Sequence, residues 1–383
     1  MRSVGLVTTS RSDWGILRPV ARALQRREDM HLRIIAGGMH LSPAFGHTVD
    51  QIVADGFETA HRIEYLQPGD SPQAVAESMG AATSAYAALF DRWRPDILLV
   101  AADRFDMFPA ALAATPFLVP TAHLHGGETT TGAFDDALRH ALTKLCHIHL
   151  VATEESARRV RQMGEPPEHV HVVGAPGLDD VQALEPLSDD QLQAEFGFAP
   201  GGVNLLVVYH PVTRAYERTA HDAAELFAAL DGVKGNVVLV RPNADTGHRA
   251  IERAIDEFCH GHPRARAMVD LPRRTFLSLM RAASVIVGNS SSGIWEAPSF
   301  QLPAVNVGTR QQGRTRAANV IDCEPAADAI AGAIRRALGP AFVGSLEGLT
   351  NPYGDGRSAE RIADVLVATP LGPDLILKRF VDL

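Results

Sequence analysis

Residues 284–300 read SVIVGNSSSGIWEAPSF, an apolar run that ends at Gly288 and Asn289 and continues through three serines and Gly293. A helical pattern carrying Glu296 follows. An apolar run, a turn of small polar residues and a helix, in this order, are typical of a strand and its crossover helix in a parallel sheet. The stretch therefore predicts one βα unit of an α/β protein.

The same pattern recurs along the chain, where short apolar runs alternate with segments whose apolar residues are three and four positions apart. In the first series we expect strands at 4–9, 31–38, 96–103, 117–127 and 147–153, and helices at 13–27, 74–92, 134–146 and 154–163. In the second we expect strands at 203–211, 236–243, 265–272, 284–289 and 304–310, and helices near 220–231, 247–261, 274–283 and 325–338. Two series predict two doubly wound, Rossmann-like α/β domains that face each other.

The boundary between the two series is marked by EPLSDDQLQAEFGFAPGG, which is rich in proline, glycine and acidic residues. This composition is typical of a linker. We therefore predict an N-terminal domain over 1–182, a linker over 183–202 and a C-terminal domain over 203–362. The final segment, 363–383, is expected to be helical. One alternative is that it crosses back and packs on the first domain.

Composition and charge indicate which classes of partner and which cellular compartment to expect. The 383 residues carry a formal charge of −9, which gives no bulk attraction to nucleic acid. The three cysteines, Cys146, Cys259 and Cys323, are far apart and form no CxxC pair, so neither a zinc site nor a disulfide framework is expected. No signal peptide and no run of 18 apolar residues is visible. We expect a cytoplasmic protein without a membrane or nucleic-acid partner.

Polar residues at the strand ends of the second series predict a diphosphate site, because ligands of such sheets bind at the carboxyl ends of the strands. Serine hydroxyls and backbone N–H groups at a helix start can bind an anion, and arginine forks match phosphate oxygens. The residues concerned are Arg241, Asn243, Ser290, Ser291, Arg310 and Arg314. Glu296 lies about one turn into the helix, where it could accept from ribose hydroxyls. Helix capping is the structural alternative for the serines.

His210 ends another strand of this series, in VVYHPVTR. A single histidine at a strand end is more often a structural hydrogen-bonding group than a catalyst. Opposite a phosphate site, however, an imidazolium would neutralise a leaving diphosphate, and this favours a functional role.

The first series is richest in acid–base groups, most of them in residues 121–140, TAHLHGGETTTGAFDDALRH. Here His123, His125, Glu128 and Asp135 bracket a Gly-Gly turn after an apolar strand. Neighbouring titratable groups in such a place shift one another's pKa values, so that one site can hold both an acid and a base. Their spacing matches no metal-ligand pattern, and we expect no metal.

Other strand ends of this series add further candidates. They are Arg11 and Asp13 after the first strand, His40 in a Gly-rich loop after the second, and Asp103 and Arg104 after the third. The structural alternatives are a helix cap at Asp13 and an ion pair between Asp103 and Arg104.

A family resemblance rests on eight motifs that occur in order between about residues 3 and 322: SRSDWG, AGGMHL, ADRFD, HGGETTTGAFDDALRHALTKL, YHPVTR, RPNADTG, VGNSSSGIWEAPSF and VNVGTRQQGR. Together they resemble UDP-N-acetylglucosamine 2-epimerases, especially the hydrolysing branch of sialic-acid and related nonulosonic-acid synthesis. The resemblance implies a glycosyltransferase-B-like fold with its active site in the cleft, no cofactor, and a homodimer or homotetramer. It also implies elimination of UDP to a 2-acetamidoglucal, followed by hydration to N-acetylmannosamine.

The resemblance also implies roles for individual residues. Nucleotide and diphosphate contacts would come from Arg11, Arg104, His210, Asn243, Ser290, Ser291, Glu296 and Arg310. Proton transfer would come from Asp103, Glu128 and Asp135, with His40, His123 and His149 as helpers. Some relatives have an acidic residue in place of His125, so the assignment of acid and base among His125, Glu128 and Asp135 stays open.

Four other functions compete with this one. The same reaction could act on a modified UDP sugar such as a UDP-2,4-diacetamido-trideoxyhexose, or the enzyme could be a non-hydrolysing epimerase. A glycosyltransferase of the same architecture is the alternative from another class, but it has little need for the acidic cluster at 123–140. That cluster also disfavours a module that only binds sugar nucleotides.

Overall fold

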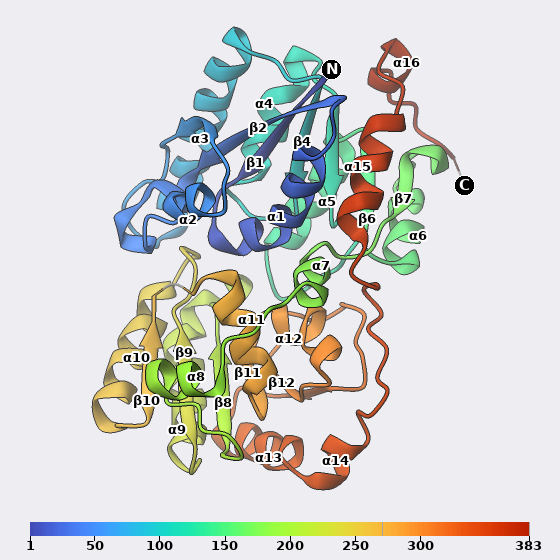
Figure 1. The fold of residues 1–383 in the computed structure, drawn as a ribbon. Helices are drawn as coiled ribbons and strands as arrows, with labels where there is room; N and C mark the ends of the chain where they lie inside the picture. Colours follow the sequence, from blue (N-terminus) through green and yellow to red (C-terminus); the bar gives the residue numbers. More distant parts are fainter. Residues whose placement is uncertain (270, 383) are drawn as a thin grey trace. The chain divides into compact units, whose positions relative to one another are not determined.

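The structure of the protein is a computed structural model that describes residues 1–269 and 271–382. The chain divides into two compact units (Figure 1). The first unit contains Met1–Glu128, Phe134–Asp180 and the segment from Tyr353 onward. The second contains Thr129–Ala133 and Val181–Pro352. Each unit is an α/β domain built on one parallel sheet, and the predicted fold class is confirmed.

The first unit contains a seven-stranded parallel sheet of order β3-β2-β1-β4-β5-β6-β7. Its strands are β1 (Arg2–Thr8), β2 (Met30–Gly37), β3 (Thr59–Ile63), β4 (Ile97–Ala101), β5 (Thr121–Leu124), β6 (Ile148–Val151) and β7 (Val170–Val172). Its helices are α1 (Arg11–Gln25), α2 (Val49–Ala54), α3 (Pro72–Arg92), α4 (Phe108–Ala114), α5 (Asp135–Leu145), α6 (Glu154–Gln162), α15 (Ser358–Ala368) and α16 (Pro373–Ile376), with α7 (Gly177–Gln182) at the passage to the second unit.

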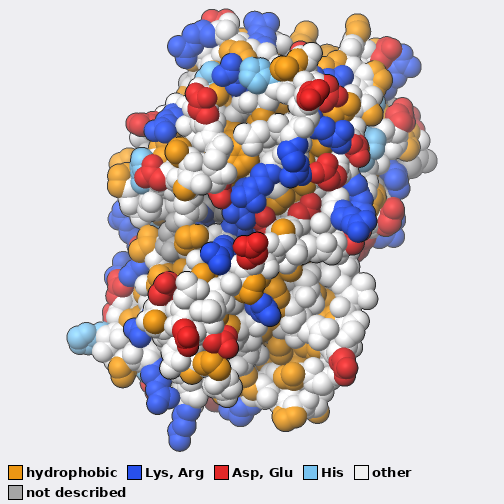
Figure 2. Space-filling model, viewed as in Figure 1, with side chains coloured by type: hydrophobic (Ala, Val, Ile, Leu, Met, Phe, Trp, Pro, Cys, Tyr) orange, Lys and Arg blue, Asp and Glu red, His pale blue; other side chains and the backbone are white. Residues whose placement is uncertain are grey.

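Helices cover both faces of this sheet, as the continuous apolar strands require. Side chains of α3, α4 and α5 form one core with Leu98 and Val100 of β4. On the viewed side, the C-terminal helix α15 packs beside α1 (Figure 1). Arg26 and Arg27 at the end of α1 form ion pairs with acidic side chains of α15, and acidic and basic side chains are interspersed over the face shown in Figure 2.

The second unit contains a six-stranded parallel sheet of order β10-β9-β8-β11-β12-β13. Its strands are β8 (Asn204–Val208), β9 (Asn236–Val240), β10 (Ala265–Met268), β11 (Val285–Gly288), β12 (Ala304–Val307) and β13 (Val320–Cys323). Its helices are α8 (Asp189–Phe196), α9 (Thr219–Asp231), α10 (His248–Gly261), α11 (Arg273–Ala282), α12 (Ser292–Trp295), α13 (Ala327–Ala337) and α14 (Pro340–Gly344). Helices α9, α10 and α13 share one core, and α8 and α11 share another on the opposite face.

The predicted linker at 183–202 is wrong. Within it, α8 begins with a capping box in which Ser188 and Gln191 satisfy each other's backbone N–H groups. Leu192 and Phe196 of this helix, with Phe198 beyond it, are buried in the core of the second unit. The polar surface of the helix gives the segment its linker-like composition, while a few apolar residues bind it to the sheet.

The predicted end of the second domain at 362 is also wrong, because the chain rejoins the first unit at Tyr353. Backbone N–H groups of Ser358 and Ala359, at the start of α15, donate to the carboxylate of Asp179. The short strands β3, β7 and β13 were not predicted. None of the helices in residues 1–269 and 271–382 is long and apolar enough to cross a membrane.

Both sheets have the strand order that creates a binding crevice. Strand order reverses direction between β1 and β4 in the first unit and between β8 and β11 in the second. Loops that leave adjacent strands toward opposite faces diverge at such a point, and ligands of open α/β sheets bind there. The residues after these four strands are therefore described next.

Candidate active site

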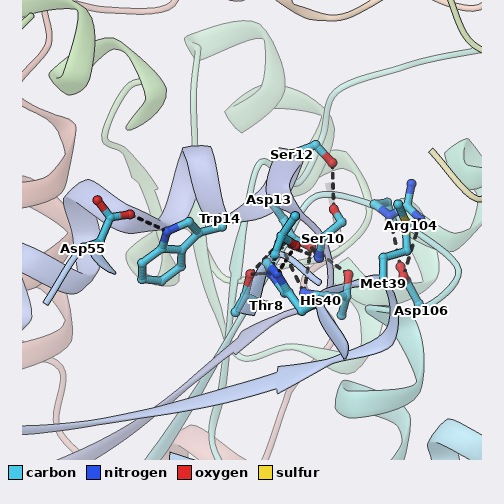
Figure 3. Close-up of polar contacts among 12 residues, drawn as sticks. Thr8, Ser10, Ser12, Asp13, Trp14, Met39, His40, Asp55, Arg104 and Asp106 are labelled. Carbon is cyan, nitrogen blue, oxygen red and sulfur yellow. Dashed lines mark hydrogen bonds and ion pairs between the residues drawn. The ribbon is translucent and has the colours of Figure 1, made fainter. Parts of the chain in front are cut away.

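Asp13, at the start of α1, is enclosed by hydrogen-bond donors in the loop after β1 (Figure 3). Its carboxylate accepts from Thr8 Oγ1 at 2.6 Å, from Thr9 N and Oγ1 at 3.0 and 2.7 Å, and from Ser10 N at 3.1 Å. Burial opposes ionisation of this group, but the interactions with His40 and the threonine hydroxyls outweigh it, so the pKa of Asp13 lies below its ordinary value. Asp13 is thus a structural group, as the capping alternative predicts.

His40 is fully buried in the same network (Figure 3). Its Nε2 lies 2.9 Å from Thr8 Oγ1 and its Nδ1 lies 2.7 Å from Thr48 Oγ1. Because both ring nitrogens are engaged inside the protein, the geometry favours a positioning role for His40 over the predicted catalytic one. Arg11, the first residue of α1, is half-buried in the same loop.

Asp103 and Arg104 follow β4 but do not form the ion pair that their adjacency suggests. Arg104 Nε donates to Asp106 Oδ1 at 3.1 Å, and its Nη2 lies 3.4 Å from Met39 Sδ (Figure 3). Asp103 instead forms an ion pair with Arg139 of α5. The structural alternative of an Asp103–Arg104 pair is therefore wrong. Ala102, with a φ of 59°, turns the chain between β4 and these two residues.

Arg139 connects the candidate acid–base groups of the first unit. Its side chain is 1% exposed, and its guanidinium donates both to the carboxylate of Asp103 and, at 2.9 Å, to the backbone carbonyl of Glu128. Asp136 Oδ1 lies 3.4 Å from the same group. One planar fork therefore holds the loop after β4 and the loop after β5 together, a geometry that arginine makes possible.

His125 and Glu128 form a buried pair across the Gly-Gly turn. Nδ1 of His125 lies 2.9 Å from Oε1 of Glu128. The turn depends on Gly127, whose φ is 75° and where a Cβ would lie 2.3 Å from the carbonyl oxygen of Ser156. A carboxyl and an imidazole at hydrogen-bond distance can share one proton, and this is a usual arrangement for acid–base catalysis.

His123 and His149, predicted as helpers, are both fully buried in the sheet. Nε2 of His123 donates to the carbonyl of Ala102 at 2.8 Å, and burial lowers the pKa of His123 to about 3. Nε2 of His149 lies 2.8 Å from Oε2 of Glu165, and burial lowers its pKa as well. Neutral, enclosed imidazoles of this kind support the strand ends, and His123 fixes the turn that precedes Asp103.

Asp135 is the first residue of α5 and is half-buried, four positions before Arg139 on the same helix. Residues four apart lie on one face of a helix. Asp135 is thus on the helix face that carries Arg139, and it stays a candidate for proton transfer.

In the second unit, Asn289 organises the loops at the strand ends. Gly288, which precedes it, has a φ of 135°, and a Cβ there would lie 2.0 Å from the carbonyl oxygen of Val208. Only glycine can make this turn. Asn289 is fully buried; its side chain accepts from His210 N and donates to His210 O, both at 2.8 Å. The loop after β11 is thereby fixed to the loop after β8.

The same asparagine fixes the loop after β12. Its carbonyl oxygen accepts from Arg310 Nη1 at 3.2 Å and from Gln311 Nε2 at 2.8 Å. On the other side, the backbone N–H of Asn243 donates to His210 Nδ1 at 3.4 Å. Three predicted binding residues, His210, Asn243 and Arg310, therefore meet around Asn289, a residue for which the sequence suggested no role.

Arg241 does not belong to this group. Its guanidinium pairs with Asp256 of α10, which disfavours its predicted place in the diphosphate site. Arg314 stacks on the indole of Trp295, with 4.4 Å between the guanidinium carbon and the ring centroid.

The serines and Glu296 lie on a shorter helix than the sequence suggested. Helix α12 is a single turn with Ser291 as its N-cap, and Ser290 Oγ lies 3.3 Å from Ser292 Oγ. One turn generates only a weak dipole, so hydroxyl and backbone donors, with the arginines, are the main features available to an anion. Glu296 ends the turn, and its Oε1 accepts from Arg273 Nη2 at 2.8 Å.

Glu296 retains one acceptor for a ligand. Its side chain is buried, and Oε2 has no hydrogen-bond partner in the part of the chain that the structure describes. Oε1 of Gln311 is in the same condition. A buried polar atom without a partner is costly unless a ligand or water satisfies it, so both atoms are suited to ligand hydroxyl or amide groups.

The structure thus gathers polar groups at both switch points. Arg139 belongs to the cluster predicted in residues 121–140, although its connecting position was not foreseen. The sequence analysis missed Asp106, Asn289, Gln311 and Arg273, because no spacing in their motifs marks them. Over residues 1–269 and 271–382 there is no group of three His, Cys, Asp or Glu side chains that could hold a metal ion.

Comparison with known proteins places the chain among sugar-nucleotide epimerases. The family model described as UDP-N-acetylglucosamine 2-epimerase matches residues 22–367. The chain is 36% identical over 378 residues, 99% of each chain, to a hydrolysing UDP-N,N'-diacetylbacillosamine 2-epimerase of Legionella pneumophila. It is 30% identical, over the full length of both, to a UDP-N-acetylglucosamine 2-epimerase of Neisseria meningitidis.

Solved structures have the same fold. A crystal structure of UDP-GlcNAc 2-epimerase from Neisseria meningitidis bound to UDP-GlcNAc superimposes with a TM-score of 0.80 at 19% identity, over 96% of this chain and all of that one.

Proposed function

The chain belongs to the UDP-N-acetylglucosamine 2-epimerase family, and from this we propose that it is a hydrolysing 2-epimerase of a UDP-linked 2-acetamido sugar. The reaction consumes water and releases UDP together with the free sugar epimerised at C2. A base removes the C2 proton while the C1–O bond to UDP breaks, which gives a glycal. Water then supplies hydroxide to C1, and a proton returns to C2 from the opposite face of the ring.

The observation that carries the proposal is that Arg139 in the first unit holds two residues that have carboxyl side chains, Asp103 and Glu128. Epimerisation needs two proton-transfer groups, and Asp103 and Glu128 are attached to one buried guanidinium, the first by its carboxylate and the second by its carbonyl. His125 adds an imidazole 2.9 Å from Glu128. In this proposal Asp103 and the His125–Glu128 pair take the two proton-transfer roles, with Asp135 as the alternative to Glu128.

The second unit would bind the nucleotide. A departing diphosphate needs cationic and hydrogen-bonding groups that stabilise its growing charge. Arg310, His210 and the donors of Ser290 and Ser291 supply groups of this kind around Asn289. The buried Oε2 of Glu296 is suited to a ribose hydroxyl. Arg11 and Arg104 stay predictions as further nucleotide contacts.

The sugar itself has two candidates. The resemblance to a UDP-N,N'-diacetylbacillosamine epimerase is higher, at 36% identity, than the 30% shared with a UDP-N-acetylglucosamine epimerase. This difference favours a 2,4-diacetamido-6-deoxy sugar, whereas N-acetylglucosamine is the simpler substrate of the same reaction. Homo-oligomerisation and a cytoplasmic location stay predictions from the sequence.

The test is a proton NMR time course in deuterated water with each UDP sugar in turn. Free UDP together with a C2-deuterated, C2-epimerised free sugar is the expected result, and the higher kcat/KM identifies the substrate. An epimer that is still attached to UDP would indicate a non-hydrolysing epimerase. Transfer of the sugar to an added acceptor without deuterium at C2 would indicate a glycosyltransferase.

A further inference from the structure

A five-residue segment, Thr129–Ala133, belongs to the second unit although the residues on both sides of it belong to the first. It hydrogen-bonds to the loop after β12. Thr129 Oγ1 donates to the carbonyl of Gly313 at 2.6 Å, and the backbone N–H of Thr131 donates to the carbonyl of Gln312 at 3.0 Å. The loop that carries Arg310 and Gln311 is thus bound by chain from far earlier in the sequence.

Glycines allow this contact to be close. A Cβ at Gly132 would lie 2.4 Å from the carbonyl oxygen of Thr309 and 2.8 Å from the backbone nitrogen of Arg310. Gly313 has a φ of 94°, and a Cβ there would lie 2.4 Å from Thr129 Oγ1. Side chains are excluded at both positions, so backbone packs directly against backbone.

The segment also contacts the loop after β8. The backbone N–H of Arg214 donates to the carbonyl of Gly132 at 3.4 Å, and Arg214 is four residues after His210. The segment is therefore bound to the two loops that carry His210 and Arg310, the residues assigned above to the departing diphosphate.

A connection that only joined Glu128 to Phe134 would need none of these contacts. Three of its five residues hydrogen-bond to the loops after β8 and β12, and Gly132 has no room for a side chain. Glu128 and Asp135, two candidates for proton transfer, flank the segment in the sequence.

We propose that Thr129–Ala133 contributes to the nucleotide site in two ways. It positions the Arg310 loop for UDP, and it couples the binding of UDP at that loop to the positions of Glu128 and Asp135. The inference rests on the proposed function, because it takes Arg310 as a UDP contact. Thr129 and Gly132 are then positioning residues, which act through the loop without touching the nucleotide.

Thr129→Val tests the first half, because valine keeps the shape of threonine and removes the hydroxyl. Loss of one hydrogen bond of this kind changes an equilibrium constant by roughly 2- to 12-fold, so we expect UDP affinity, measured by calorimetry on the full chain, to fall about 3- to 10-fold. Thr129→Ser should restore it. Thr83→Val is the matched control, since Thr83 Oγ1 also donates to a backbone carbonyl, that of Met79 at 2.9 Å in α3; its UDP affinity should stay within about 2-fold of wild type.

Gly132→Ala should weaken UDP binding more than Thr129→Val, because the loop must move to admit the methyl group. If Gly132→Ala fails to fold, the UDP affinity of Thr129→Val alone tests the positioning role. A Thr129→Val variant that binds UDP like the wild type overturns the inference. Arg310→Ala separates this failure from failure of the nucleotide site: if Arg310→Ala also binds UDP normally, the proposed UDP site itself is wrong.

Hydrogen exchange tests the second half. With UDP bound, we expect slower amide exchange in the peptide that covers residues 129–133, and a smaller change in Thr129→Val at saturating UDP. Unchanged exchange in this peptide while calorimetry reports full occupancy would overturn the link to Glu128 and Asp135.

Discussion

Replacing Arg139 with lysine is expected to slow turnover strongly while UDP binding is retained. Arg139 is nearly inaccessible to solvent, and its fork donates both to the Asp103 carboxylate and to the Glu128 carbonyl. Lysine keeps the positive charge but has one compact ammonium group on a flexible stem. It can replace one of these two contacts, and the other proton-transfer group loses its fixed position.

The size of the effect follows from the contact that is lost. A hydrogen bond that involves a charged group contributes about 1.5–3 kcal/mol. If that contact matters only for the geometry of the reacting groups, its loss raises the activation barrier by the same amount. Since about 1.4 kcal/mol corresponds to tenfold in rate, kcat of Arg139→Lys should fall by roughly 10- to 150-fold. UDP affinity should stay within about 2-fold, because the residues assigned to UDP at the strand ends of the second unit are unchanged.

The assay is UDP release under saturating substrate, together with calorimetric titration of UDP and a thermal melt. Arg159→Lys is the matched control. Arg159 Nη1 donates to the carbonyl of Gly127 at 3.1 Å, in the same turn, but its carboxylate partner is Glu155 of its own helix, which is not a proton-transfer candidate. We expect its kcat within about 3-fold of wild type. If Arg139→Lys turned over as fast as Arg159→Lys, Arg139 would not organise the acid–base groups.

Three further predictions follow from the same contacts. Asp103→Asn and Glu128→Gln should each lower kcat by about 10²–10⁴-fold, the usual contribution of a proton-transfer group, and should slow deuterium incorporation at C2 in parallel; turnover within fivefold of wild type would contradict the assignment. Arg310→Ala should weaken UDP binding in calorimetry, whereas Arg241→Ala, whose guanidinium is paired on α10, should not; equal losses would show that the wrong arginine was chosen. The pKa of His123 falls from 6.5 to about 3 on folding. Below pH 6.5, His123 is therefore protonated in the unfolded chain but stays neutral in the folded chain. The free energy of unfolding should therefore fall from pH 6.5 to 5 by about 2 kcal/mol less in His123→Asn than in wild type, as measured by urea denaturation at each pH; equal losses would exclude this source.

The sequence was sufficient for the architecture because strands at the sheet centres, such as β4, β8 and β11, are almost wholly apolar and are followed by polar turns. The missed strands, β3, β7 and β13, lie at sheet edges, where one neighbour and a half-buried face require less apolar sequence. Helix α8, which was also missed, is short and mostly polar. In these cases tertiary contacts, not local pattern, decide the structure.

The candidate site was predictable in its location but not in its pairings. Topology brings all strand-end residues to one edge of each sheet, so a list of polar strand ends already contains most of the candidates. Which side chain meets which depends on the backbone conformation of the turns and on the side chains of neighbouring loops. Asp103 and Arg104 are adjacent in the sequence but have different partners, Arg139 and Asp106.

Each switch point also needs one polar residue for support alone, and this explains why candidates of one chemical type divide into two groups. Asp13 in the first unit and Asn289 in the second are buried. Asp13 fixes the backbone of its own loop at Thr9 and Ser10, and Asn289 fixes the neighbouring loop at His210. Their side chains are already engaged with the protein. Glu296 differs, because only one of its two buried oxygens is paired within the described chain. Unused hydrogen-bonding capacity, which the sequence cannot display, is the observation that keeps Glu296 a candidate for ligand binding.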